Sequence, residues 1–531
     1  MKFKQICSLV LMTALAVSVA SCGGKGKTDD LQLESGEVSY PLENGGGKLT
    51  VWRVLDPGVS QVAQSQNETE LTKWVKEETG IDITFVHPPA GQDGEKFNLM
   101  LASGEMPDIV VYNLSKSKEG AEALVNGGYI YRLEEDFLKS YAPNYYKILE
   151  NDAELRKSAT LNDGSFYGFS HWREAENMTV YSGLMMRQDW LDDLKLAVPE
   201  TMDEWYTVLK AFKNNKGASA PFTTFGNAPF SAGAFTGAFN TKLDYYVRNG
   251  KITHGVLDPS FKDFITTMKK WYDEGLLDAD FASADKEQVD TKMLTGKSGA
   301  TYGMIGSGMG GLLAAAPDNS YKIVAVPYPA AKKGEISEFG AKDSRYYEPC
   351  YLISGTSPNK QLAARFLDFG YTEKGKMLYN FGKEGVSYDM VDGFPTFNDN
   401  IYKNKDGLTP TQALSKYTHC TFLGPFEFDE RFFKQQYAYQ EQKDAIDIWA
   451  KTNAVEHVIV SYNAFTEEEQ EELAKYLSDL NTYISENVTK FIMGIRPISE
   501  YDAFLKELKD RNLDRVIEIK QAAYDRYNSR K

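Results

Sequence analysis

Cysteine is scarce in this sequence of 531 residues. Only four cysteines are present, Cys7, Cys22, Cys350 and Cys420. No two of them have the CxxC spacing of a redox or zinc motif. An exported location permits a disulfide between Cys350 and Cys420, and two buried free thiols are the alternative.

Positive charge is also in short supply. The chain carries 59 Lys and Arg against 75 Asp and Glu, a formal net charge of −16. No cluster of Lys or Arg offsets this excess, so the surface repels phosphate backbones. The composition therefore excludes nucleic acid as a partner.

Familiar catalytic and nucleotide-binding motifs are missing as well. The sequence contains no GxSxG and no HExxH, its five histidines are scattered, and "TKMLTGKS" lacks the first glycine of a P-loop. Carboxylates are abundant, and the spacing that matters for a glycosidase pair is spatial. The sequence alone therefore does not exclude a catalytic pair of carboxylates, but it does not identify two particular residues for that role.

Long hydrophobic runs are absent beyond the N-terminus, where no later segment reaches the ~20 apolar residues of a membrane helix. Residues 1–21 combine two lysines, the apolar run "ICSLVLMTALAVSVA" and small residues before Cys22. This layout is typical of a secretory signal. The end of the run, "VASC", resembles a bacterial lipobox. That resemblance implies cleavage before Cys22, acylation of its thiol (palmitate is one such chain) and a membrane anchor on the extracytoplasmic face.

What the remaining sequence contains is an alternation of strand-like and helix-like segments. Residues 22–47 are rich in Gly and charge and predict a flexible tether. "KLTVWRVL" (48–55), "IDITFVHPP" (81–89) and "DIVVYN" (108–113) have strand composition, and helical segments at 68–80 and 95–107 separate them. The pattern predicts an α/β fold with a parallel sheet, whose ligands bind outside the carboxyl ends of the strands.

Several ordered segments resemble extracellular solute-binding proteins, family 1, the substrate-binding lipoproteins of ABC importers. These include "TGIDITFVHPPAGQDGEKFNLMLASGEMPDIVVYN", "GLMMRQDWLDDLKLAVPETMDEWYTVLKAFK" and "LISGTSPNKQLAARFLDFGYTEKGKMLYNFGKEGVSY". The resemblance implies two periplasmic-binding-protein-like lobes joined by hinge crossings, with a ligand cleft between them. We expect residues 48–170 with 302–345 in the first lobe, and 171–301 with 346–531 in the second.

Many larger members of that family carry a calcium loop, and this sequence departs from them. The matching region, "NNKGASAP" (214–221), contains no acidic residue. We therefore expect no metal there. "GSGMGG" fits GxGxxG at Gly306, Gly308 and Gly311, but the following helix is short and no acidic residue ends the next strand. We expect no nucleotide cofactor, and a turn that only glycine permits is the alternative use of these residues.

Aromatic residues form 13% of the chain, and sugar rings stack on aromatic planes while a few polar groups hold their hydroxyls. Strand ends, the hinge and the glycine segment supply the candidate ligand-binding residues: Trp52, Arg53, Asp93, Tyr112, Asn113, Trp172, Arg173, Phe225, Ser307, Met309 and Glu348. Four tryptophans at helical positions beside apolar neighbours are expected in the core: Trp74, Trp190, Trp205 and Trp271.

The leading interpretation is a lipid-anchored, monomeric receptor that captures a sugar or oligosaccharide and delivers it to an ABC permease without chemistry. A lipid-anchored glycoside hydrolase is the main alternative. A helical-repeat glycan-binding lipoprotein is a third reading, but the strand-like segments argue against it.

Overall fold

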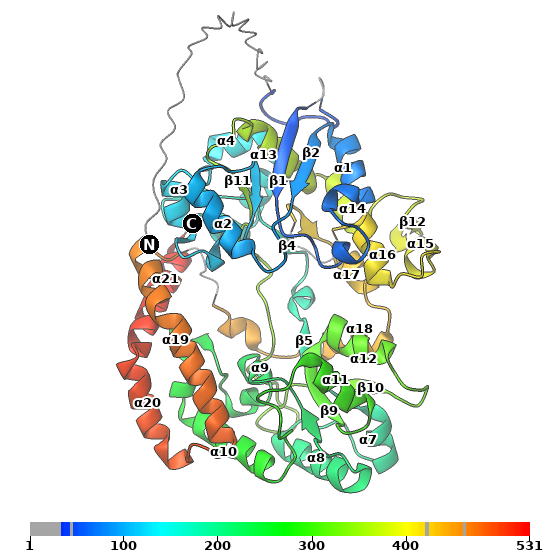
Figure 1. Ribbon diagram of the computed structural model, residues 1–531, viewed down its shortest axis with the longest axis vertical. Coiled ribbons are helices and arrows are strands. Elements are labelled where there is room, and N and C mark those ends of the chain that lie inside the picture. Colours follow the sequence, from blue (N-terminus) through cyan, green and yellow to red (C-terminus); the bar gives the residue numbers. More distant parts are fainter. Residues whose placement is uncertain (1–32, 43–45, 420–423, 460–463, 531) are drawn as a thin grey trace, which may run out of the picture. The chain divides into compact units, whose positions relative to one another are not determined.

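A computed structural model describes residues 33–42, 46–419, 424–459 and 464–530 (Figure 1). This part of the chain contains two four-stranded sheets, with strand orders β11-β3-β1-β2 and β10-β5-β9-β6. A separate hydrophobic core packs against each sheet. The chain therefore has the predicted two-lobed α/β architecture, and we call the lobe of the first sheet the first lobe.

The first lobe combines early strands with one from far along the sequence. Its sheet contains β1 (Lys48–Trp52), β2 (Asp82–Val86), β3 (Ile109–Val111) and β11 (Tyr351–Ile353). β1 pairs in parallel with β2 and β3, whereas β11 is antiparallel to β3 (Figure 1). The other elements are α1 (Glu70–Thr79), α2 (Asp93–Ser103), α3 (Gly120–Asn126), α4 (Glu135–Tyr141), α5 (Pro143–Asn151), α6 (Ala153–Ala159), α13 (Lys360–Asp368), α14 (Glu373–Phe381), β12 (Tyr388–Val391), β13 (Phe394–Phe397), α15 (Asp399–Tyr402) and α16 (Pro410–Tyr417).

Local sequence explains why α1 forms where it was predicted. The Thr69 hydroxyl accepts a hydrogen bond from the backbone N–H of Thr72, which caps the first turn. Gly80 ends the helix in the left-handed region at φ 73°, a conformation that glycine adopts without strain. Trp74 lies on the buried face between these two caps.

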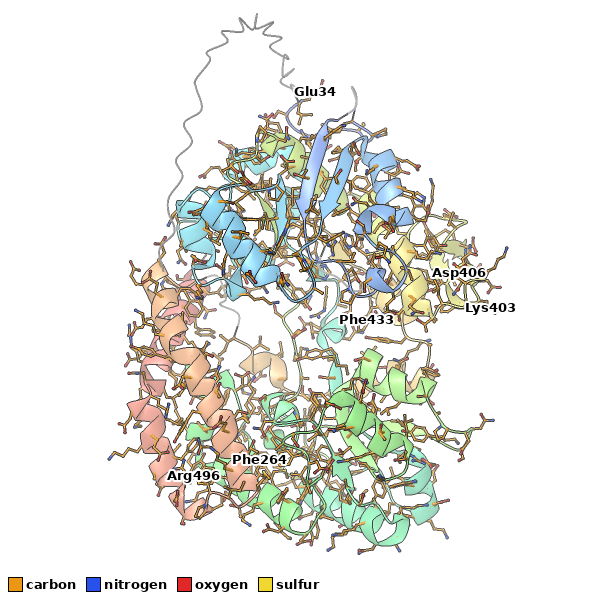
Figure 2. All side chains as sticks on the ribbon, viewed as in Figure 1. Glu34, Phe264, Lys403, Asp406, Phe433 and Arg496 are labelled. Carbon is orange, nitrogen blue, oxygen red and sulfur yellow. The ribbon has the colours of Figure 1, made fainter. Side chains whose placement is uncertain are left out.

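The second lobe carries the larger core. Its sheet contains β5 (Ser182–Arg187), β6 (Phe222–Thr223), β9 (Ala300–Met304) and β10 (Ile323–Val326). Phe264 and Phe433 both belong to this core (Figure 2). The predicted core tryptophans Trp190, Trp205 and Trp271 are buried here, and Trp74 is buried in the first lobe. The other elements are α7 (Gln188–Leu194), α8 (Met202–Lys216), α9 (Ala228–Ser231), β7 (Tyr245–Arg248), β8 (Lys251–His254), α10 (Pro259–Asp273), α11 (Lys286–Leu294), α12 (Gly311–Ala314), α18 (Gln440–Trp449), α19 (Glu467–Ile492), α20 (Tyr501–Asp510) and α21 (Leu513–Ser529). The short helix α17 (Glu430–Gln435) instead packs against β13 of the first lobe.

The long helix α19 begins with a capping box, in which Thr466 and Glu469 satisfy each other's backbone N–H groups. It packs against α10 and α21. Neither α19 nor any other helix in the described ranges is both long enough and apolar enough to span a membrane.

Three chain segments run side by side where the two sheets are connected. β4 (Trp172–Arg173) pairs in parallel with β14 (Glu427–Phe428), and Trp172 also forms a bridge with Tyr346. The predicted hinge at residues 171–173 thus lies at a three-stranded crossing.

The sheet topology corrects part of the predicted division into lobes. Residues 302–345, expected in the first lobe, contribute the end of β9 and all of β10 to the second sheet. Conversely, β11 lies in the first sheet, although residues 346–531 were assigned to the second lobe. The chain changes lobe at each crossing, and the strand-like pattern of a segment carries no information about the sheet that it joins.

The N-terminal segment Glu34–Leu42 corrects the predicted tether of residues 22–47. Buried Arg365 donates from Nη2 to the carbonyl oxygen of Glu34 (labelled in Figure 2). The Tyr40 hydroxyl donates to the carbonyl of Arg365, and the N–H of Leu42 donates to the carbonyl of Thr79. This part of the expected tether is therefore packed on the first lobe, while the signal segment 1–21 and Cys22 lie outside the described residues.

Candidate functional site

A cavity of about 200 Å³ opens at the carboxyl ends of β1 and β3 in the first lobe. Because parallel strands end at the same edge of a sheet, residues that follow β1 and β3 meet here. Its lining residues, which define the first-lobe cavity, are Arg53, Val54, Leu55, Asp56, Pro57, Asp93, Val111, Tyr112, Asn113, Lys116 and Cys350. Four of the predicted ligand-binding residues, Arg53, Asp93, Tyr112 and Asn113, are thus brought together.

Arg53 is the most deeply buried charged group of this cavity, with 4% of the residue exposed. Its Nη1 donates to the hydroxyl of Tyr351 at 3.2 Å. Its Nε has no hydrogen-bond partner in the described structure. The sequence predicted the position of this cation but not its burial.

Asp56 was missed by the sequence analysis, although it lies in the loop after β1 and directly follows the strand-like segment 48–55. One carboxylate oxygen, Oδ1, accepts hydrogen bonds from the N–H groups of Gly58 at 2.7 Å and Val59 at 3.3 Å. Burial raises the pKa of this carboxyl group, while neighbouring Arg53 acts in the opposite direction. The position of Asp56 after a strand end was the signal that could have identified it.

Trp52 and Tyr112 form an aromatic group with Phe97 under the first-lobe cavity. The rings of Phe97 and Tyr112 stack with their centroids 4.1 Å apart, and Trp52 packs against both. Trp52 is 5% exposed and does not line the cavity. This corrects its predicted role as a cleft wall, because an inward-facing residue of β1 is buried by α2.

A second cavity, of about 110 Å³, lies at the end of β9 in the second lobe. It joins two predicted residues, Phe225 and Ser307, to residues that the sequence analysis missed. We call it the second-lobe cavity, and its lining residues are Met185, Phe225, Lys286, Val289, Asp290, Thr301, Tyr302, Gly303, Met304, Ser307, Gly308 and Leu312. Met304 is 55% exposed, so this cavity presents apolar surface to solvent.

The glycine segment beside it is not a dinucleotide-binding turn. Residues Ile305–Gly310 form a π-helical segment, and α12 after it has only four residues. A Cβ on Gly310 would lie 2.5 Å from Nε2 of Gln442, so glycine serves close packing there. Met309 is fully buried in the second core. This corrects its predicted ligand contact.

The predicted hinge residues are engaged with protein neighbours. Trp172 is 3% exposed, and its ring stacks on Tyr371 at 5.5 Å between centroids with an interplanar angle of 1°. Its Nε1 donates to Oε1 of Glu427 at 3.1 Å. One side of this group borders a polar cavity of about 370 Å³ whose lining includes Trp172, Tyr371 and Glu427.

Arg173 and Glu348 also have protein partners. Arg173 pairs with Asp343 at 3.0 Å, and its guanidinium lies over the ring of Tyr347 at 4.6 Å. The hydroxyl of Tyr167 donates to Oε1 of Glu348 at 3.3 Å. Neither residue lines the first-lobe or the second-lobe cavity, so the structure does not bring them together with the other predicted site residues.

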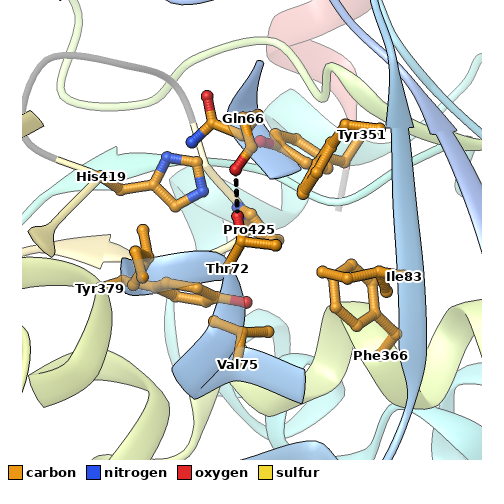
Figure 3. Close-up of a pocket in the computed structure, with 11 residues that line it drawn as sticks. Gln66, Thr72, Val75, Ile83, Tyr351, Phe366, Tyr379, His419 and Pro425 are labelled. Atoms are coloured by element: carbon orange, nitrogen blue, oxygen red, sulfur yellow. Dashed lines mark hydrogen bonds between the residues drawn. The ribbon is translucent and has the colours of Figure 1, made fainter. Parts of the chain in front are cut away.

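A further cavity, drawn in Figure 3, lies inside the first lobe between β2, α1 and α14. The hydroxyl of Thr72 donates across it to the carbonyl of Gln66 at 2.7 Å (Figure 3). Its volume of about 20 Å³ accommodates one water molecule. A sugar ring does not fit in this cavity.

The structure describes no cluster of three or more His, Cys, Asp or Glu side chains suited to a metal ion within its described residues. Between α8 and β6, the region in which the family resemblance raised the question of a calcium loop, only residues 217–221 intervene. Cys350 is a buried free cysteine, and burial raises the pKa of its thiol to about 12. Cys420, its proposed disulfide partner, lies outside the described residues.

Acidification below pH 6.5 is expected to destabilise the fold. Burial lowers the pKa of His171 to about 3, of His254 to about 4, and of His419 well below its usual value. The unfolded chain binds protons at these positions below about pH 6.5, so the stability present above that pH is lost as the pH falls. Burial raises the pKa of the Asp368 carboxyl group to about 6 and also raises that of Asp56, which opposes the trend, whereas burial lowers the pKa of His87 and adds to it.

Melting temperatures measured between pH 7.5 and pH 5.0 test this expectation. The melting temperature should decrease steadily on acidification, and His254→Gln should make the decrease smaller. A melting temperature that is flat or rises toward pH 5.0 would contradict the assignment of three neutral buried imidazoles.

The comparison with known families agrees with this geometry. The sequence profile of the bacterial extracellular solute-binding proteins matches residues 61–377. The fructooligosaccharide ABC transporter substrate-binding protein FusA of Streptococcus pneumoniae is 24% identical over 562 residues, spanning 100% of both chains. The lipoprotein LipO of Bacillus subtilis is 26% identical over 416 residues, or 76% of this chain and 79% of LipO.

Solved structures share the fold at lower identity. FusA in complex with kestose superimposes with a TM-score of 0.72 at 21% identity, covering 91% of this chain and 100% of FusA. The alginate-binding protein AlgQ2 without calcium ion gives a TM-score of 0.71 at 23% identity, covering 92% and 100% of the two chains. With the matched profile spanning more than half of its length, the chain belongs to the bacterial extracellular solute-binding protein family.

Proposed function

We propose that this protein is the substrate-binding component of an ABC importer, a receptor that captures an oligosaccharide and releases it unaltered to a membrane permease. The observation that carries the proposal is a pair of cavities, one at the strand ends of each lobe, in a chain of the solute-binding family. Each cavity alone is smaller than the ~300–1,000 Å³ typical of ligand pockets. The proposal therefore assigns each lobe one half of the site.

The chemistry of the two cavities supports a sugar ligand. The first-lobe cavity offers fixed polar groups, including Arg53, Asp93 and Asn113. The second-lobe cavity offers Phe225 and Tyr302, whose rings can cover the apolar face of a sugar. FusA is a fructooligosaccharide-binding protein by its description, and YtcQ of Bacillus subtilis is described as a polygalacturonan/rhamnogalacturonan-binding protein. Both descriptions favour a carbohydrate here.

The proposal extends to the location of the protein. Cys22 would carry the lipid, and the receptor would work as a monomer on the extracytoplasmic face of the membrane. The permease and its ATPase would be separate chains. No covalent step is part of this function.

A panel of oligosaccharides, followed by both melting temperature and product analysis, tests the function. A ligand that binds only the folded state raises the melting temperature, and a receptor leaves the sugar intact. We expect stabilisation by at least one oligosaccharide without new products. Turnover of a bound sugar would assign the protein to the hydrolases instead.

Phe225→Ala and Asp93→Ala should each weaken binding of that sugar by at least ~10-fold, about 1.4 kcal/mol. Both side chains are partly exposed, so neither change should lower the melting temperature of the free protein appreciably. Phe394→Ser is the matched control, because this phenyl group is exposed on the hairpin of β12 and β13. Isothermal titration calorimetry measures all three variants. If only one of the two variants loses affinity, the ligand does not use both lobes.

A further inference from the structure

The second-lobe cavity has an apolar floor and a polar rim. Its floor includes Met185, Val289 and Leu312, which are 0%, 3% and 1% exposed. Lys286 and Ser307, by contrast, are exposed to solvent at its mouth. A ligand that enters this cavity therefore meets polar groups first and aliphatic or thioether groups at the bottom.

The buried polar groups of the lining already have partners. Oγ1 of Thr301 donates to the carbonyl oxygen of Tyr302 at 3.3 Å, and the hydroxyl of Tyr302 is hydrogen-bonded to Oγ of Ser182 at 2.7 Å. Within the described structure, none of the side chains that line this cavity holds a buried polar atom without a hydrogen-bond partner. A sugar hydroxyl on the floor would exchange its water partners for groups that are already paired, which costs free energy.

The size of the cavity also restricts what can occupy it. Its volume of about 110 Å³ exceeds the ~30 Å³ of a water molecule but is well below the ~300–1,000 Å³ of a complete ligand pocket. It therefore fits a substituent of a sugar better than a whole oligosaccharide. Sugars carry two common apolar substituents of this size, the methyl group of an acetamido group and the C6 methyl group of a 6-deoxy sugar.

We infer that the captured oligosaccharide carries such a methyl group, on an acetamido or a 6-deoxy sugar, and that this methyl group is buried on the floor of the second-lobe cavity. The inference rests on the proposed function and names the substrate class of the same site. Burial of a methyl group is favourable in proportion to the apolar area removed from water. A hydroxyl group at the same place gains no new partner, so the floor distinguishes the two.

The rim would hold the rest of the sugar unit. Phe225 can cover the apolar face of its ring. Lys286 and Asp290 form an ion pair along one turn of α11, and these groups can bind hydroxyls next to the ring. Val289 precedes Asp290 in the same helix and lies on the floor, so it is a specificity-determining residue.

The test compares sugars that differ only at the methyl group. The pairs are tri-N-acetylchitotriose with tri-N-formylchitotriose, and 2′-fucosyllactose with its analogue that has L-galactose in place of L-fucose. Kestose, maltotriose and xylotriose serve as sugars without a methyl group. By calorimetry on the purified chain, we expect the methyl-bearing member of at least one pair to bind more tightly, by at least ~4-fold for the acetamido pair or ~10-fold for the 6-deoxy pair. The pair that shows the preference identifies the source of the methyl group.

Val289→Thr keeps the shape of the floor and adds a hydroxyl group to it. It should lower the preference for the methyl-bearing sugar at least ~2-fold, because the hydroxyl of the other sugar gains a partner. Val208→Thr is the matched control, since Val208 is 4% exposed on α8 in the same core but does not line the cavity. It should leave the preference unchanged. Circular dichroism checks folding, and if Val289→Thr does not fold, the preference of the unaltered protein decides the question.

Three results overturn the inference in distinguishable ways. Equal binding within both pairs, or tightest binding by a sugar without a methyl group, refutes the methyl-bearing ligand and leaves the proposed receptor function standing. A preference that Val289→Thr and Val208→Thr change equally refutes the position of the methyl group. If no sugar of the panel binds, the proposed function fails and the inference fails with it.

Discussion

Replacing Trp172 by alanine is expected to lower the free energy of unfolding by about 3–5 kcal/mol, the range for a large aromatic residue removed from a core. The indole is almost fully buried, stacks in parallel on Tyr371 and donates to Glu427. Its removal leaves a cavity at the crossing and deprives the Glu427 carboxylate of a donor. Denaturant-induced unfolding, followed by tryptophan fluorescence and by circular dichroism, measures the loss.

Trp172→Phe is the informative control. It keeps an aromatic ring against Tyr371 and loses the hydrogen bond, so a smaller effect, on the order of 1–2 kcal/mol, is expected. The sequence analysis instead predicted that Trp172 contacts the ligand, and a residue with that role would weaken ligand binding at least ~10-fold on Trp172→Ala without unfolding the domain. A stable alanine variant with tenfold weaker sugar binding would support that earlier prediction and contradict the packing role.

Cys22→Ser is expected to release nearly all of the protein from the membrane. Each buried CH₂ of an acyl chain contributes about 0.8 kcal/mol to membrane binding, and two chains make the attachment stable. Serine has no thiol to form the thioether. Cell fractionation with immunoblotting, together with labelling by radioactive palmitate, measures the effect.

The chain offers a matched control in Cys7, which lies inside the apolar run of the expected signal. Cys7→Ser should leave both palmitate labelling and membrane attachment unchanged. If Cys22→Ser remains in the membrane fraction, or if Cys7→Ser is the variant that loses the label, the lipobox assignment is wrong.

Local sequence patterns were sufficient for much of the fold. The segments around β1, β2 and β3, and the helix that ends at Gly80, lie where composition and turn residues indicated. These features depend on neighbours within a few residues, which a sequence displays directly. Family resemblance supplied the two lobes, but neither source identified the sheet to which residues 302–345 belong, because β10 is recognised only by its pairing with β5.

The sequence could predict those site residues that lie where the carboxyl ends of neighbouring parallel strands meet. Arg53, Asp93, Tyr112 and Asn113 line one cavity because each follows or faces the carboxyl end of a parallel strand. Trp52 and Met309 show the limit of this argument. Both have the right position along the chain, but the side of the backbone from which a side chain projects depends on tertiary packing.

The antiparallel partnership of β11 with β3 has a consequence for how the chain reaches its native state. Val111 and Tyr351 are paired across a separation of about 240 residues, and contacts between such distant positions are slow to form. The sheet of the first lobe therefore cannot be completed by the N-terminal part of the chain alone. Until residues 351–353 are available, β3 is an open edge of this sheet, and an open edge can pair with a non-native strand.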